Sequence, residues 1–85
     1  MTTRAVTFTK QAAKALVRMP RNDATRIRAK IDQYAADPAS LANNVKKLVG
    51  SDYTRLRVAD YRIIMAEDGT VVDVITIGVR GGVYD

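Results

Sequence analysis

The residues best suited to chemistry lie in the second half of the chain and carry guanidinium or phenol groups: Arg55, Arg57, Arg62, Arg80 and Tyr84. Guanidinium groups bind phosphate oxygens through paired hydrogen bonds and stabilise the charge that develops when a phosphodiester is attacked. A tyrosine beside several arginines is biased toward its phenolate, which can serve as a base toward a 2′-hydroxyl. This set indicates a phosphodiester substrate and cleavage without histidine.

A simpler interpretation of the same residues is a solvated basic sheet face with a packed terminal tyrosine. Lys46 and Lys47 are typical of a solvated loop, and we count them with Arg57 as candidate phosphate contacts. The remaining tyrosines are expected in the core or at a sheet edge rather than as stacking platforms for bases: Tyr34, Tyr53 and Tyr61.

Composition narrows the possible functions. The 85 residues predict one domain, residues 1–85. With 14 Lys and Arg against 9 Asp and Glu, the net charge of +5 favours nucleic acid as a partner, or else an acidic protein segment. Cysteine and histidine are absent, which excludes disulfides, thiolate nucleophiles and the commonest metal ligands. The acidic residues show no metal-site spacing, so no metal or cofactor is expected.

No apolar run approaches the ~20 residues that span a bilayer, and the N-terminus lacks a signal-peptide pattern, so we expect a cytoplasmic protein.

The first half of the chain predicts a strand and two helices. Arg4 to Phe8 is typical of a strand, and Thr9 is a plausible N-cap for a helix over Lys10 to Met19. After Pro20, a second helix is expected from about Asp23 to Ala36, capped by Asn22 and packed against the first as an antiparallel hairpin. The expected buried stripes are Ala12, Ala13, Leu16 and Val17, then Ala24, Ile27, Ile31 and Tyr34.

The second half predicts strands. Ala39 to Ser51 is expected to be a loop, followed by strands at Tyr53–Val58, Tyr61–Ala66 and Thr70–Val79. The order β-α-α-β-β-β gives an α+β domain, in which a two-helix hairpin packs on one face of a small antiparallel sheet.

If Ala59 and Asp60 form a two-residue turn, Arg57 lies opposite Arg62 and Arg55 opposite Ile64. These three arginines then share one face of the sheet, where their mutual repulsion would be relieved by an anion.

The face on which Arg80 lies depends on the turn at Asp68-Gly69. A two-residue turn would place Arg80 on the face opposite Arg62, whereas a three-residue turn with a glycine bulge would bring it alongside. We favour the bulge, which directs Ile75 and Ile77 to the helices and leaves Asp73 near the sheet's edge.

The segment Tyr53-Thr54-Arg55-Leu56-Arg57-Val58-Ala59-Asp60-Tyr61-Arg62-Ile63-Ile64 resembles the central hairpin of RelE-type toxins of the RelE/ParE toxin–antitoxin superfamily. The segment Val74-Ile75-Thr76-Ile77-Gly78-Val79-Arg80-Gly81-Gly82-Val83-Tyr84 resembles their last strand and catalytic tail. The resemblance covers nearly the whole chain. It implies a RelE-like fold and a metal-independent endoribonuclease that cleaves mRNA in the ribosomal A site. It also implies inhibition by a cognate antitoxin, with a toxin–antitoxin heterotetramer as one possible assembly.

Carried over by position, the resemblance makes Arg55 and Arg62 ligands of the scissile phosphate and Arg80 the residue that stabilises the transition state. Tyr84 matches the tyrosine that orients the substrate or transfers a proton. Arg57 matches a basic position whose role is left open between binding in the groove and supporting the structure.

This chain departs from some relatives, with Tyr53 in place of a lysine, Val79 in place of a histidine or lysine, and no C-terminal helix after Asp85. Two alternatives stay open: a ParE-like inhibitor of DNA gyrase, and a degenerate module that only binds the antitoxin.

Overall fold

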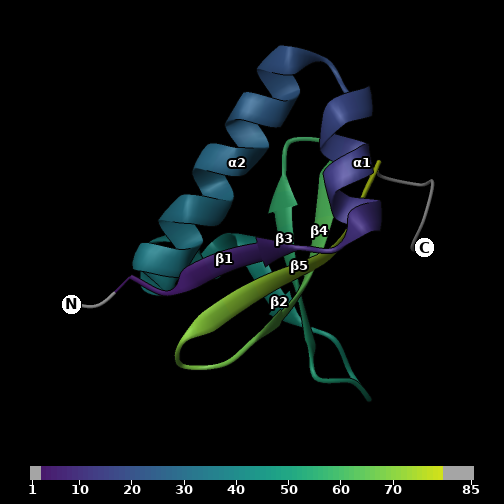
Figure 1. Ribbon diagram of the computed structural model, residues 1–85. Helices are drawn as coiled ribbons and strands as arrows, with labels where there is room; N and C mark the ends of the chain where they lie inside the picture. Colours follow the sequence, from purple (N-terminus) through teal and green to yellow (C-terminus); the bar gives the residue numbers. More distant parts are fainter. Residues whose placement is uncertain (1–2, 80–85) are drawn as a thin grey trace.

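The computed structural model describes residues 3–79 of the chain. Strand β1 (Ala5–Phe8) leads into helices α1 (Lys10–Arg18) and α2 (Arg21–Ala36), which diverge from a shared corner as a V (Figure 1). A 3-10 segment, η1 (Pro38–Asn44), then leads to four strands: β2 (Val45–Lys47), β3 (Tyr53–Val58), β4 (Tyr61–Glu67) and β5 (Val71–Val79). The predicted α+β class and helix pair are confirmed.

The five strands form one twisted sheet in the order β1-β5-β4-β3-β2. Its antiparallel part, β2 to β5, is as expected, but β1 pairs parallel to β5, so the sheet is mixed. The segment expected to be a loop also contains β2, because Lys46 and its neighbours pair with β3. Both differences arise at the edges of the sheet, where pairing depends on partners distant in the sequence.

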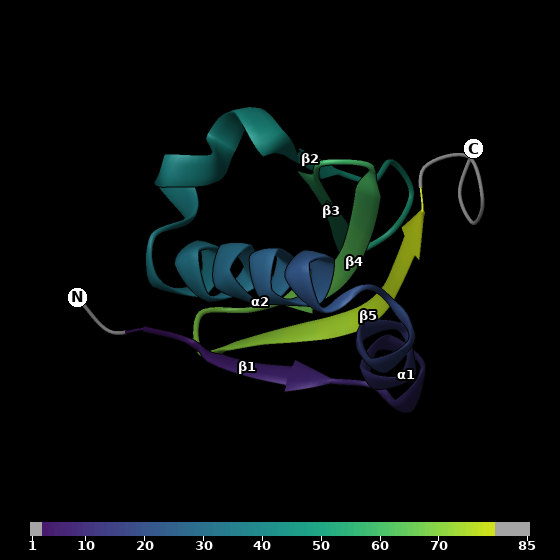
Figure 2. The ribbon, with the colours of Figure 1, turned by 90° about the horizontal axis from the view of Figure 1, so that it is seen from above.

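Both helices and η1 contribute to one core on a single face of the sheet, with α1 beside β1 and β5 and α2 running across the sheet (Figure 2). Ile27 and Ile31 of α2 are fully buried against residues such as Leu56, Ile63 and Val74. The predicted stripe of α2 is therefore confirmed. On α1 the stripe is narrower, because Val17 is 84% exposed and only Ala12 is fully buried.

Local signals set the helix boundaries. The Thr9 side chain accepts a hydrogen bond from the amide of Ala12 at 3.2 Å, which confirms it as the N-cap of α1. The cap of α2 is different from the one expected. Pro20 occupies the N-cap, with no side-chain cap bond, and Asn22 lies inside the first turn. Proline starts the helix here because its backbone angle suits a helix start and its missing amide is not needed.

A β-bulge in β5 decides which side chains reach the core. Met65 pairs with Val74 and Ile64 with Thr76, so Ile75 has no partner on β4. Val72 and Val74 consequently face the helices before the bulge and Ile77 after it, so the expected burial is correct for Ile77 and wrong for Ile75. The Thr9 hydroxyl donates to the carbonyl of Ile75 at 2.5 Å, which satisfies the bulged peptide from the start of α1.

The expected glycine bulge at the Asp68-Gly69 turn is therefore wrong. The amide of Asp68 donates to the carbonyl of Val71 at 3.0 Å and closes a tight turn. The Asp68 carboxylate accepts from the amides of Thr70 and Val71 at 2.7 and 2.8 Å. These bonds lower the pKa of Asp68, and the side chain, rather than a left-handed Gly69, organises the turn.

Asp73 does not lie near an edge as expected. β5 is an internal strand, and Asp73 accepts a 2.8 Å hydrogen bond from the Thr7 hydroxyl on β1.

Candidate functional site

The β3–β4 hairpin has the predicted register. Arg57 pairs with Arg62, Arg55 with Ile64 and Val58 with Tyr61. Leu56 and Val58 point into the core, so Arg55 and Arg57 project from the opposite face. This arrangement follows from the Ala59-Asp60 turn, in which Ala59 adopts a positive φ of 52°. A two-residue turn fixes the register of the strands that it joins.

The strands on either side extend this face, which the helices leave uncovered and which we call the open face. One row across the sheet reads Lys46–Arg55–Ile64–Thr76, and the next reads Arg57–Arg62–Gly78. Ile64, Thr76 and Gly78 are themselves buried, so the accessible part of the rows is at β2 and β3. Lys46 is exposed and lies beside Arg55, as a phosphate contact requires. Lys47 pairs with Thr54 and therefore projects to the other face of β2. The sheet brings together Lys46, Arg55, Arg57 and Arg62, and Lys47 is separate from them.

A hollow of about 460 Å³ lies over the β2 end of this face. Its walls combine cations with side-chain amides from the end of η1: Asn43, Asn44, Val45, Lys46, Arg55 and Arg57. We call it the basic groove. Amide groups and guanidinium groups together suit the phosphate and sugar atoms of a nucleic-acid backbone, which accept hydrogen bonds from both.

Among the residues that the structure describes, no acidic side chain pairs with the arginines of the basic groove. Within residues 3–79, neither Arg55 nor Arg57 takes part in an ion pair or a side-chain hydrogen bond. The ion pairs of this part of the chain lie elsewhere, at Arg4–Glu67 and Arg28–Asp32. An anionic ligand would therefore meet donors that need not first give up a protein partner.

Arg80 and Tyr84 lie outside the described residues, so their predicted roles stay predictions. The strand that leads to them is described as far as Val79. Because the bulge at Ile75 changes the alternation of β5, Gly78 lies directly opposite Arg62 on the open face. The even-numbered end of β5 therefore shares the face of Arg62, as expected, but the bulge responsible lies at Ile75 rather than at the Asp68-Gly69 turn.

The three tyrosines within residues 3–79 divide into two structural residues and one exposed one. The Tyr61 hydroxyl donates to the Asp23 carboxylate at 2.7 Å, tying β4 to α2, and this bond raises the pKa of Tyr61. Tyr34 is 5% exposed and belongs to the core. Tyr53 is 40% exposed and shares the face of Arg55 at the far end of β3.

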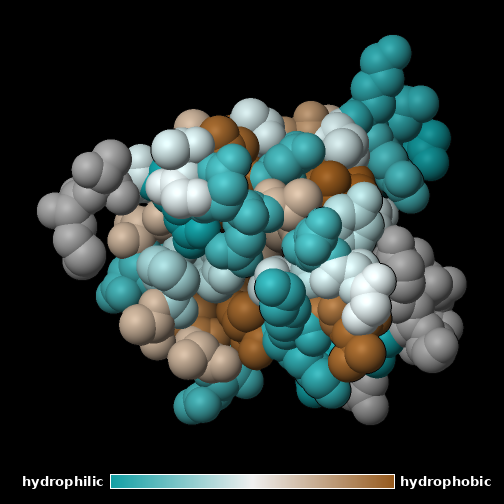
Figure 3. All heavy atoms as spheres, turned by 90° about the horizontal axis from the view of Figure 1, so that it is seen from below, coloured by the Kyte–Doolittle hydropathy of each residue, from teal (hydrophilic) through white to brown (hydrophobic). Residues whose placement is uncertain are grey.

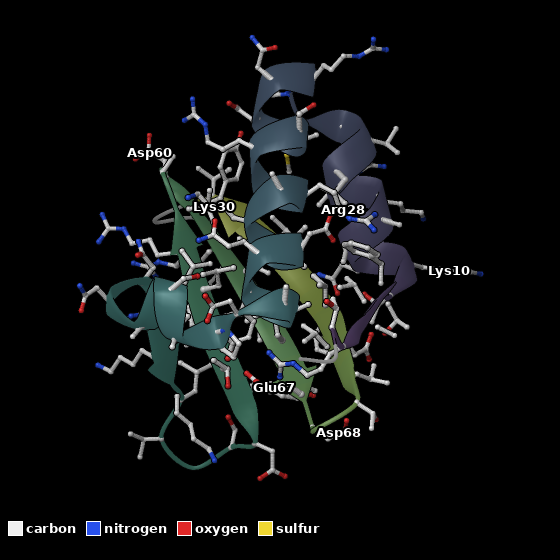
Figure 4. The ribbon with its side chains drawn as sticks, turned by 90° about the vertical axis from the view of Figure 1, so that its left-hand side faces the viewer. Lys10, Arg28, Lys30, Asp60, Glu67 and Asp68 are labelled. Carbon is white, nitrogen blue, oxygen red and sulfur yellow. The ribbon has the colours of Figure 1, made fainter. Side chains whose placement is uncertain are left out.

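A structural ion pair that the sequence did not reveal joins the N-terminus to α2 and β4. Arg4 contacts Glu67 at 2.7 Å, donates to the carbonyl of Tyr34 at 3.0 Å and lies 5.2 Å from the centre of its ring. The Tyr34 hydroxyl donates to the other carboxylate oxygen at 2.5 Å. Figure 4 shows Glu67 on the helix side of the sheet, in contrast to Asp68 at the turn.

The contacts within this cluster shift the pKa values of Glu67 and Tyr34. Burial raises the pKa of Glu67, but hydrogen bonds from Tyr34, Arg4 and Thr54 and the charge of Arg4 outweigh it, so that the pKa is lowered. Burial and the bond to Glu67 raise the pKa of Tyr34 to about 12. Arg4 therefore serves the fold, and no spacing in the sequence connects residues so far apart.

Seen from below, hydrophobic residues reach the surface as separate patches among hydrophilic ones (Figure 3). Across residues 3–79 there is no helix long and apolar enough to cross a membrane, and no group of three or more acidic side chains placed to hold a metal ion.

Comparison with known proteins gives a family and a fold. Residues 6–84 match the family described as the ParE toxin of type II toxin–antitoxin system, parDE. A chain of the archaeal RelE–RelB complex from Pyrococcus horikoshii OT3 is 29% identical, with a TM-score of 0.80 over 94% of this chain and 98% of that one.

Two structures from E. coli show the same fold at lower identity. The isolated RelE toxin is 20% identical, with a TM-score of 0.76 over 95% of this chain and 88% of that one. The intact RelBE toxin–antitoxin complex is 21% identical, with a TM-score of 0.74 over 89% of this chain and 95% of the matched chain. A search of curated proteins finds no match.

Proposed function

The chain belongs to the ParE toxin family of type II toxin–antitoxin systems, and we propose that within this family it is a ribosome-dependent, metal-independent endoribonuclease that cleaves mRNA and inhibits translation. The observation that carries the proposal is the pairing of Arg57 with Arg62, with Arg55 on the same open face. Like charges placed opposite one another destabilise a sheet, so this arrangement is better explained by an anionic ligand than by folding. The fold shared with RelE toxins supports the same activity.

In the proposed reaction, the 2′-oxygen attacks the adjacent phosphorus and the 5′-oxygen of the next nucleotide leaves. The products are a 2′,3′-cyclic phosphate and a 5′-hydroxyl, and the proton lost by the 2′-hydroxyl is balanced by one gained at the leaving oxygen. Arg55 and Arg62 bind and polarise the phosphate, and Arg80 stabilises the extra charge of the transition state. Tyr84 orients the substrate or transfers a proton.

Other basic residues bind the RNA at positions remote from the reacting atoms. Lys46 and Arg57 line the basic groove and bind backbone phosphates. Lys47 projects to the other face of β2, where it would reach only a strand that passes around the sheet edge.

A cognate antitoxin is the proposed protein partner, as in the RelE–RelB complexes to which the fold is similar. An acidic or amphipathic segment of the antitoxin would cover the basic groove or displace its arginines, and two toxins with two antitoxins would form a heterotetramer. The toxin would act in the cytoplasm, where translating ribosomes are found.

The matched family supports a second candidate, inhibition of DNA gyrase in the manner of ParE toxins. A gyrase inhibitor needs a protein-binding surface but has no need of a phenol beside a phosphate site. The third candidate, a module that only binds the antitoxin, would likewise be indifferent to the tyrosine hydroxyl.

Translation of a defined message in vitro separates the candidates. We expect purified toxin to cut the message within the ribosomal A site, leaving 2′,3′-cyclic phosphate ends, with few cuts in naked RNA. The assay contains no divalent metal beyond what ribosomes need, and a parallel reaction contains gyrase and plasmid DNA. Intact message together with accumulated gyrase-cleaved DNA would replace the ribonuclease proposal by the second candidate. Intact message and intact DNA would leave the antitoxin-binding module.

A further inference from the structure

We propose that Arg26, Lys30 and Arg57 form a second phosphate-binding site, which holds the RNA backbone after it has passed from the open face of the sheet to the helix side. The inference rests on the proposed ribonuclease function, which it extends to residues of α2. It adds a backbone contact remote from the scissile phosphate, so its ligand is a nucleic-acid phosphate.

The geometric basis is a hollow of about 240 Å³ between α2, η1 and the β3–β4 hairpin. Cations come from two elements, Arg26 and Lys30 from α2 and Arg57 from β3, and Asn44 adds an amide. Its floor is apolar and is made by Leu41, Leu56 and Val58. An apolar floor keeps water away from one side of a bound anion and so strengthens its attraction to the surrounding cations.

Within the described part of the chain, no acidic side chain pairs with the cations of this hollow. Within residues 3–79, neither Arg26 nor Arg57 makes an ion pair or a side-chain hydrogen bond, and the Lys30 ammonium makes one long bond, 3.5 Å, to the Gln33 amide oxygen. The acidic residues of α2 are used elsewhere, since Asp23 accepts from Tyr61 and Asp32 pairs with Arg28.

The acidic residue in the turn after β3, Asp60, is also outside the hollow. Asp60 lies at the tip of the hairpin and does not line it (Figure 4). The hollow therefore presents concentrated positive charge, and no acidic residue among those described lines it.

The hollow continues the basic groove. Arg57 and Asn44 line both, so the two sites meet at the edge where η1 passes β3. A backbone bound at Arg55 can therefore pass Arg57 and reach Lys30 without leaving positively charged surface. This continuity favours a polymer with regularly spaced phosphates over an acidic peptide, because both sites then bind the same repeating group.

The test measures binding of the full chain to a single-stranded, 2′-O-methylated RNA, which cannot be cleaved, over a range of salt concentrations. In the Arg26→Ala/Lys30→Ala variant, two phosphate contacts are lost. We expect the slope of log Kobs against log salt to become shallower by about 1.4, roughly 0.7 for each contact. The Arg26→Gln/Lys30→Gln variant, which keeps most of each side-chain stem, should show the same change.

The matched control is Lys10→Ala/Lys14→Ala, which removes the same charge from exposed positions of α1. Lys10 projects away on the far side of the molecule from Lys30 (Figure 4), so this variant should keep nearly the wild-type slope. Thermal unfolding of each variant separates lost binding from lost folding.

The other possible results would contradict either the second site alone or the basic groove as well. Wild-type binding with unchanged slopes in both α2 variants would overturn the second site and leave the ribonuclease proposal intact. Equal loss in the α1 control would also overturn it, by showing only an effect of net charge. Unchanged RNA binding with weakened antitoxin binding would reassign the hollow to a protein contact. Absence of RNA binding by the wild type would overturn both this site and the basic groove.

Discussion

Arg57 on β3 lies directly opposite Arg62 on β4, and both project from the face of the sheet that the helices leave uncovered. Residues in such positions have Cβ atoms about 4.5–5.5 Å apart, and like charges there cost stability. A phosphate bound between the two guanidinium groups would relieve their mutual repulsion.

Replacement of Arg57 by Gln should accordingly separate stability from function. We expect the free energy of unfolding to rise by up to about 0.5 kcal/mol, because a like-charge contact is removed, while RNA affinity falls. Urea unfolding and RNA binding measure the two effects. A loss of stability in Arg57→Gln would show that the arginine serves the fold.

Alanine at Arg62 or Arg80 should abolish growth arrest without unfolding the protein, because we assign both guanidinium groups to the phosphate. Growth after induction and thermal unfolding are measured together, with Lys14→Ala, an exposed lysine of α1, as the control. A variant that remains fully toxic, or that loses toxicity only because it unfolds, contradicts the assigned role.

Replacement of Tyr84 by Phe keeps the ring and removes the hydroxyl. If the hydroxyl transfers a proton, the single-turnover cleavage rate on programmed ribosomes should fall about 10²- to 10⁴-fold. A much smaller loss would assign the ring to base stacking. Tyr53→Phe is a suitable comparison, because Tyr53 is exposed on the same face but has no assigned proton transfer.

The Arg4–Tyr34–Glu67 cluster should make stability depend on pH. Because the folded-state pKa of Glu67 is lowered, its contribution is present above the unfolded pKa of about 4.3 and is lost as pH falls through the folded value. Because the pKa of Tyr34 is raised to about 12, its contribution is lost as pH rises from about 10 to 12.

Urea unfolding of the Glu67→Gln variant checks the acidic part of this prediction. At pH 7 we expect a loss of roughly 1–3 kcal/mol, since a carboxylate that accepts from Arg4 and Tyr34 is replaced by a neutral amide. The difference from wild type should shrink at pH 3. A difference that is the same at both pH values would mean that the charge of Glu67 does not contribute.

Glycine at position 59 should stabilise the hairpin. Ala59 has a φ of 52°, a conformation that costs an L-residue roughly 1–2 kcal/mol and costs glycine little. We expect Ala59→Gly to gain about 0.5–1 kcal/mol, whereas Ala29→Gly, at an exposed position of α2, should lose about as much. Equal losses in both variants would mean that the turn is not strained.

The hairpin that carries the candidate site could be predicted from the sequence alone. Two apolar-alternating runs joined by Ala59-Asp60 allow few pairings, and burying Leu56 and Val58 selects the one in which Arg55 and Arg57 face outward. The α2 stripe of Ile27 and Ile31 was equally predictable, because it depends only on helical spacing. These features are determined by residues close together in the chain.

Other features depend on contacts between segments that are distant in the sequence, so local sequence patterns could not predict them. The bulge at Ile75 is accompanied by a hydrogen bond from the distant Thr9 hydroxyl to the Ile75 carbonyl, and β1 pairs parallel to the last strand of the chain. Likewise, Arg4 binds Glu67 and Arg57 shares a hollow with Lys30 only because the chain folds back on itself. The sequence by itself determined the hairpin and its outward arginines, since turn length and alternation act locally. Only the tertiary structure decided which of those cations stand beside others, because that depends on closing loops of many residues.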